Sequence, residues 1–116
     1  MFQDTVIDGV QYRIYYPEGI DPNNIPADTQ VALYMHGGGN TIGDTNDAMN
    51  YLNNAYNNTK SIIMMPNASN RTTEEYFNDV VNSYDNFISE KNINQNKLVV
   101  SGYSSGYYST FGVLDT

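Results

Sequence analysis

The chain has 116 residues, of which 40% are hydrophobic and 16% are charged, so its composition fits one globular domain and excludes a disordered chain. Its formal net charge of −8 argues against nucleic acid or an anionic membrane as a partner, because both require a basic surface. It contains 0 cysteines, which excludes disulfides and thiolate metal sites.

A β-hairpin is predicted at the start of the chain. Residues 5–7 and 10–16 have the pattern of strands, and the Asp8-Gly9 pair between them is a strong turn signal. A loop rich in proline and glycine is predicted over residues 17–28. Because side chains alternate along a strand, the second strand has two faces, one with Tyr12, Ile14 and Tyr16 and the other with Arg13 and Tyr15.

The rest of the chain alternates between apolar strands and amphipathic helices. Continuous apolar runs at residues 31–35 and 61–65 predict strands buried on both faces, and another strand is predicted at residues 98–100. Helical spacing of apolar residues predicts helices over residues 48–56 and 72–91, the second of which begins with a capping box. The apolar stripe of this second helix consists of Tyr76, Phe77, Val80, Val81, Tyr84, Phe87 and Ile88.

This alternation predicts an α/β fold with a single domain over residues 1–116. We expect a mostly parallel sheet with helices on both faces and the antiparallel hairpin at its start. In such a sheet the reactive crevice lies at the carboxyl ends of the strands. Two glycine-rich stretches lie at the carboxyl ends of predicted strands, His-Gly-Gly-Gly at residues 36–39 and Gly-Tyr-Ser-Ser-Gly at residues 102–106. We expect the topology to bring these two stretches together.

The second stretch has the G-x-S-x-G pattern of a serine on a sharp strand-to-helix turn. Such a turn lifts the oxygen of Ser104 clear of the sheet and directs the next backbone N–H, that of Ser105, at the same point. Preorganised N–H donors of this kind stabilise the negative charge that develops on oxygen during acyl transfer. The pattern therefore favours Ser104 as a nucleophile.

The chain resembles the amino-terminal half of an α/β-hydrolase of the esterase and lipase type, that is, a truncated α/β-hydrolase fold. Residues 36–43 are similar to the H-G-G-G-x-x-x-G oxyanion loop of that family and residues 102–106 to its nucleophile elbow. Residues 92–104 are similar to the corresponding run of feruloyl esterases and polyhydroxyalkanoate depolymerases.

The resemblance implies a serine hydrolase that acts on carboxylic esters, of small molecules or of polymers, with no cofactor and no metal. It assigns Ser104 as the nucleophile and the backbone N–H groups of Ser105, Gly38 and Gly39 as oxyanion-hole donors. It assigns His36 a structural role in the oxyanion loop.

The catalytic triad is incomplete within these 116 residues. In the family the chain order is serine, acid, histidine, whereas the only histidine here, His36, precedes Ser104. Asp115 is the only acid after Ser104, and it lies on the helix predicted just behind the elbow. We therefore expect a hydrolase fragment that is inactive alone. Its unpaired sheet edge favours self-association or pairing with a complementing carboxyl-terminal half.

Other interpretations stay open. Ser104 can be an ordinary turn serine, and the chain can be a non-catalytic α/β-hydrolase-like domain that binds a partner or builds a larger assembly. Nucleotide binding is excluded, because Asp44 replaces the lysine of a P-loop and Ile42 replaces the last glycine of the dinucleotide pattern. No signal peptide or membrane-spanning run is visible, so we expect a soluble, cytoplasmic protein by default.

Overall fold

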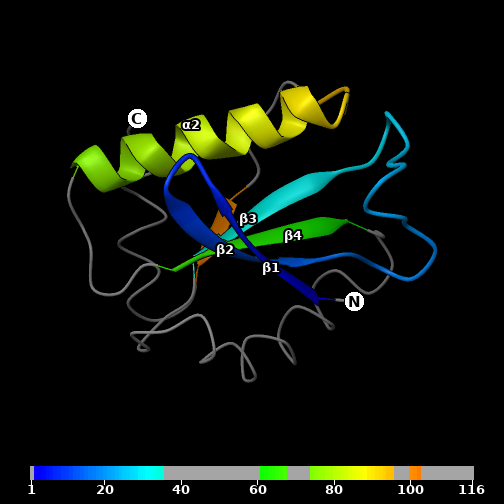
Figure 1. Cartoon of the computed structure of the whole chain (residues 1–116), viewed down its shortest axis with the longest axis horizontal. Coiled ribbons are helices and arrows are strands. Elements are labelled where there is room, and N and C mark those ends of the chain that lie inside the picture. Colours follow the sequence, from blue (N-terminus) through cyan, green and yellow to red (C-terminus); the bar gives the residue numbers. More distant parts are fainter. Residues whose placement is uncertain (1, 36–60, 68–73, 96–99, 103–116) are drawn as a thin grey trace.

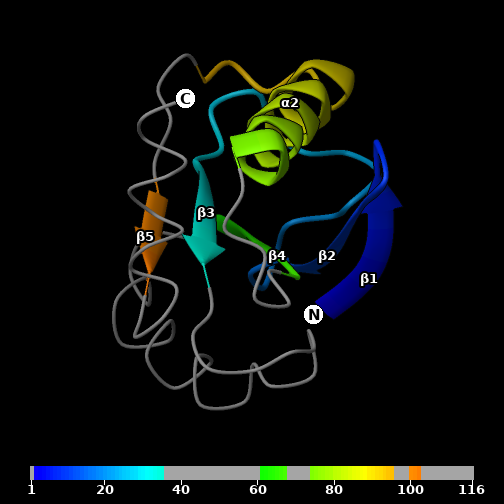
Figure 2. The ribbon, with the colours of Figure 1, turned by 90° about the vertical axis from the view of Figure 1, so that its left-hand side faces the viewer.

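The computed structural model describes residues 2–35, 61–67, 74–95 and 100–102 of the chain. Their elements are β1 (Phe2–Ile7), β2 (Val10–Tyr15), β3 (Val31–Met35), β4 (Ile62–Pro66), α2 (Glu74–Glu90) and β5 (Val100–Gly102). The strands form one sheet in the order β1-β2-β4-β3-β5, with β1 and β5 at opposite ends (Figure 2). The helix α2 lies across one face of this sheet (Figure 1).

The predicted hairpin is confirmed. Its two turn residues both have positive φ, 50° at Asp8 and 81° at Gly9, as a two-residue hairpin turn that matches the twist of its strands requires. β1 and β2 pair antiparallel from the turn, where Ile7 faces Val10, to the far end. Alternation along β2 is also as predicted, because Tyr12 and Ile14 are buried towards α2.

The prediction of a mostly parallel sheet with helices on both faces is wrong. β1–β2 and β2–β4 are antiparallel, while β4–β3 and β3–β5 are parallel, so the sheet is mixed. The physical reason is that β2 pairs directly with β4, with Ile14 opposite Met64, so the hairpin is built into the main sheet. The described residues contain one helix, on one face; the helix expected over residues 48–56 lies outside them.

The two central strands, β3 and β4, are buried on both faces, as their continuous apolar sequences predict. Alternate side chains such as Leu33 and Met64 join the main core under α2. The intervening side chains form a second apolar cluster on the other face, which consists of Ala32, Tyr34, Ile63 and Met65 with Tyr15 packed against it. Burial of both faces means that displacement of either strand from the sheet would expose apolar surface on two sides.

Helix α2 packs on the sheet through the apolar stripe that the sequence predicts. Tyr76, Val80 and Tyr84 are almost fully buried in the main core, and Val81 is partly buried at its border. The helix ends where Asn92 adopts a positive φ of 57° and the N–H of Ile93 donates to the carbonyl of Ile88 over 3.0 Å. Within the described residues, no helix is long and apolar enough to cross a membrane.

The start of β3 is held by the side chain of Gln95. The N–H of Val31 donates to Oε1 of Gln95 over 2.7 Å, and Nε2 of Gln95 donates to the carbonyl oxygen of Val31 over 2.7 Å. Tyr84 Oη from α2 also donates to this carbonyl over 3.1 Å and accepts a hydrogen bond from Gln95. The segment after α2 therefore connects the helix to the first residue of the central strand.

We expect Gln95→Leu to lower the free energy of unfolding by about 1–3 kcal/mol, because it leaves the buried N–H of Val31 without its acceptor. The same chemical change at the exposed Gln30 is the matched control and should have little effect. Urea unfolding followed by circular dichroism measures both. Equal effects of the two substitutions would contradict a structural role for the Gln95 amide.

The outer strand pair carries one ion pair on the face away from α2. Arg13 Nε lies 2.8 Å from one carboxylate oxygen of Asp4, and a second guanidinium nitrogen lies 3.1 Å from the other oxygen. The hydrogen bond from Arg13 is the main cause that lowers the pKa of Asp4 below its ordinary value of 3.8. Asp4 is 52% exposed, so solvent screens the pair and its contribution is small.

A lowered carboxyl pKa stabilises the folded state above the ordinary pKa of 3.8, and this stabilisation is lost as the pH falls through the lowered value. We therefore expect Asp4→Asn to cost a few tenths of a kcal/mol near neutral pH, and this cost to vanish once the pH has fallen through the lowered pKa of Asp4. Urea unfolding of both proteins across this pH range is the measurement. A cost that persists at low pH would show that the carboxylate charge is not its source.

Candidate functional site

The carboxyl ends of β3 and β5 lie side by side. These strands pair in parallel, and the last residue of β3, Met35, is the register partner of the last residue of β5, Gly102. The next residues in the sequence are His36, which begins the His-Gly-Gly-Gly stretch, and Tyr103, the second residue of the G-x-S-x-G stretch. Both motifs therefore start from neighbouring strands at the same edge of the sheet.

The residues predicted to form the site lie outside the described part of the chain. These are the nucleophile, the three oxyanion-hole donors and the structural histidine, namely Ser104, Gly38, Gly39, Ser105 and His36. Their roles stay predictions. The structure describes the strand ends from which the two motifs begin, together with the core that supports these ends.

A pair of amides that sequence reasoning did not select lies at the carboxyl end of β4. The N–H of Asn67, the residue after β4, donates to the carbonyl of Gln11 over 2.9 Å, and its Nδ2 donates to Oε1 of Gln11 over 3.1 Å. These bonds tie the end of β4 to β2. Since β4 pairs with β3, they help to hold the sheet edge from which the first motif begins. A polar residue directly after a buried strand is the sequence signal that could have indicated this contact.

The hydroxyl of Tyr12 lies in the core of the described residues. Burial is the main cause that raises the pKa of Tyr12, which therefore stays neutral at physiological pH. Its Oη lies 2.6 Å from Oγ of Ser83 and 3.2 Å from the carbonyl of Val80, under α2 and away from solvent. This pair therefore stabilises the packing of α2 on β2.

A metal centre is not visible in the described ranges, where no group of three or more histidine, aspartate or glutamate side chains could hold an ion.

No protein-family model matches the chain, and no curated protein sequence matches it. A solved structure, the esterase of Pyrobaculum calidifontis, is similar to it with a TM-score of 0.63 and 17% sequence identity. The similarity covers 91% of this chain and 36% of the esterase chain, so the chain spans about a third of that protein. At this identity the likeness shows the fold alone. This chain therefore folds like that part of the esterase.

The register of β3 and β5 is testable by cross-linking, because the chain has 0 cysteines of its own. Leu33 and Val100 are register partners that pack in the same core cluster, so cysteines at these two positions are within reach of a disulfide. We expect Leu33→Cys/Val100→Cys to oxidise within one chain, which mass spectrometry detects as the loss of two hydrogens. Ala32→Cys/Val100→Cys is the control, since Ala32 belongs to the cluster on the opposite face. Cross-linking of the control alone would contradict this register.

Proposed function

We propose that this chain carries the nucleophile and the oxyanion hole of a serine hydrolase that acts on carboxylic esters. The observation that supports the proposal is the pairing of Met35 with Gly102, because the first motif begins directly after Met35 and the second begins at Gly102. The hydrolase-like fold, shared with an esterase, agrees with the same chemistry. Neighbouring parallel strands lie about 5 Å apart, which is close enough for the two loops to surround one acyl carbon.

In this proposal Ser104 attacks the ester carbonyl, and negative charge develops on the carbonyl oxygen. The backbone N–H groups of Ser105, Gly38 and Gly39 donate to that oxygen, and each such donor contributes about 3 kcal/mol to the stability of the transition state. Glycines suit the loop because they let the backbone approach the substrate without a clashing Cβ. His36 has a structural role in this loop.

The general base comes from polypeptide other than these 116 residues. A serine hydroxyl is a weak nucleophile until a base takes its proton, and the only histidine of the sequence belongs to the oxyanion loop. The complementing polypeptide joins the sheet beside β5. Among the described strands, β5 has a neighbour on one side only, which is β3.

Chemical complementation tests this function. We expect a fluorophosphonate probe to label Ser104 slowly, and added imidazole to accelerate the labelling on the order of tenfold, a part of what a positioned base contributes. Intact-mass spectrometry measures the rate. Ser104→Ala should abolish labelling, whereas Ser105→Ala should retain it, because only the backbone N–H of that residue takes part.

Equal labelling of the wild type and Ser104→Ala would contradict the proposal. Ester turnover by the chain without any added base would contradict the view that the base lies elsewhere. Absence of labelling at Ser104 under every condition would favour the alternative, a non-catalytic hydrolase-like domain that binds a partner. The incomplete triad is the observation that supports this alternative.

A further inference from the structure

The sheet is open at the edge formed by β1. Among the described strands, β1 pairs with β2 alone and ends the sheet on that side (Figure 2). The side chains of Gln3 and Asp4 are exposed, and the apolar side chain of Val6 is 65% exposed. This edge lies at the opposite end of the sheet from β5, so it is separate from the proposed ester site.

The pairing of β2 determines which backbone groups of β1 face outward. The carbonyl of Gln11 accepts a hydrogen bond from the N–H of Asn67 over 2.9 Å, so the backbone polar groups of Gln11 face the β4 side. Gln11 is the register partner of Val6, and this pair is therefore not hydrogen-bonded. The N–H and carbonyl of Val6 consequently face away from β2. Hydrogen-bonded and non-hydrogen-bonded pairs alternate along an antiparallel ladder, so the same groups of Phe2 and Asp4 also face outward.

β1 carries few of the features that protect an edge strand from pairing with another chain. Natural edges are protected by proline, by lysine, by a bulge or by very short length. The six residues of β1, Phe-Gln-Asp-Thr-Val-Ile, include neither proline nor lysine, and their register with β2 continues unbroken from Ile7 to Phe2. The charge of Asp4 is paired with Arg13 of β2. The strand therefore presents a regular row of donors and acceptors.

The outward groups are arranged symmetrically about Asp4, which makes the strand its own complement. Phe2 lies two residues before Asp4 and Val6 lies two residues after it. An identical strand that runs antiparallel therefore matches every outward residue of β1, with Asp4 opposite Asp4 and Phe2 opposite Val6. Between these pairs, the polar residues Gln3 and Thr5 are opposite each other. A twofold arrangement of this kind uses the same surface on both copies.

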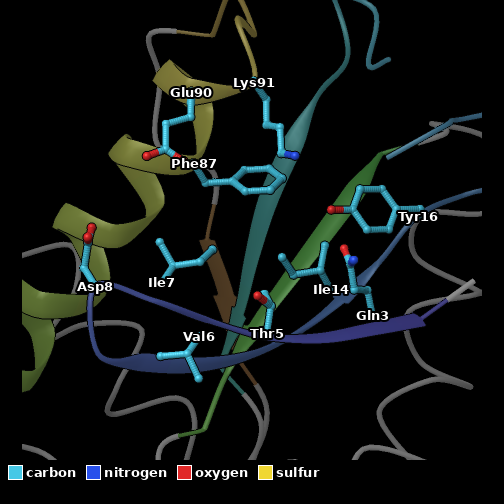
Figure 3. A pocket seen from close by; sticks show the side chains of 10 residues that line it. All are labelled: Gln3, Thr5, Val6, Ile7, Asp8, Ile14, Tyr16, Phe87, Glu90 and Lys91. Carbon is cyan, nitrogen blue, oxygen red and sulfur yellow. The ribbon is translucent and has the colours of Figure 1, made fainter. Parts of the chain in front are cut away.

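We propose that β1 pairs antiparallel with β1 of a second copy of the chain, about a twofold axis at Asp4, and joins the two sheets into one. About six backbone hydrogen bonds connect the copies, two for each hydrogen-bonded pair of residues. Thr5 and Ile7 point towards α2 and line a groove there, whereas Val6 lies on the other side of the strand (Figure 3). The pairing leaves the β5 end of the sheet available to the complementing polypeptide.

Sedimentation equilibrium of the whole chain tests the pairing. An interface of one strand pair is small, so we expect a weak dimer whose fraction rises with concentration up to about 1 mM. Val6→Pro removes an outward N–H and no bond to β2, so it should abolish the dimer and leave the circular dichroism of the chain unchanged. Val6→Thr keeps this N–H and is the control that should still dimerise. A monomer at about 1 mM, or a dimer that persists unchanged in Val6→Pro, would overturn the proposal.

Cross-linking tests the register without a proline substitution. Gln3 is opposite Thr5 of the second copy in a non-hydrogen-bonded pair, which is the closer kind of pair and is within reach of a disulfide. The chain has 0 cysteines of its own. An equimolar mixture of Gln3→Cys and Thr5→Cys chains should therefore oxidise mainly to the mixed disulfide, which mass spectrometry distinguishes from the two symmetric ones. A mixed product no more abundant than the symmetric products together would refute this register.

The charge at the axis gives a further test. Asp4→Asn should tighten the dimer about two- to fivefold, because like charges no longer face each other across the axis. Asp85→Asn is the matched control, since it removes the same charge from an exposed position on α2 and should change the affinity little. Equal effects of the two substitutions would contradict the position of Asp4 at the axis.

Discussion

Strand β3 pairs with β4 on one side and with β5 on the other, and all five of its residues are buried. Its first residue, Val31, is held by Gln95 and Tyr84, and its last residue, Met35, faces the end of β5. A strand held at its start, at both edges and on both faces cannot shift without breaking hydrogen bonds and exposing apolar surface. This constraint fixes the position of the carboxyl ends of β3 and β5, where both motifs begin.

The rest of the described structure supports β3 from outside. β2 brings the hairpin into the sheet through β4, and the amides of Gln11 and Asn67 tie the end of β4 to β2. Helix α2 covers β2, β4 and β3 with one apolar stripe, and the segment after it returns to the start of β3 through Gln95. Polar contacts that link elements far apart in sequence thus position the central strand.

Two surfaces with different chemistry result from this arrangement. Glycine-rich sequences begin at the carboxyl ends of β3 and β5, and the chemistry proposed there depends on backbone N–H groups. Along the hairpin, a groove is lined by acidic and basic side chains, among them Asp8, Glu90 and Lys91. The two surfaces use different strands, so substitutions in one can be made without altering the other.

Local pattern alone was enough to predict the Asp8-Gly9 turn, the faces of β2, the double burial of residues 31–35 and the apolar stripe of α2. Each of these depends on side-chain periodicity or on a conformational preference of a few adjacent residues. The order of the strands depends instead on pairings between distant segments, and the continuous apolar strands suggested a sheet that is mostly parallel. Only the tertiary structure decided that β2 lies antiparallel to β4 and that Met35 lies opposite Gly102. It also decided that residues 3–16 and 87–91 enclose one groove, because long-range packing and not local sequence sets which elements meet.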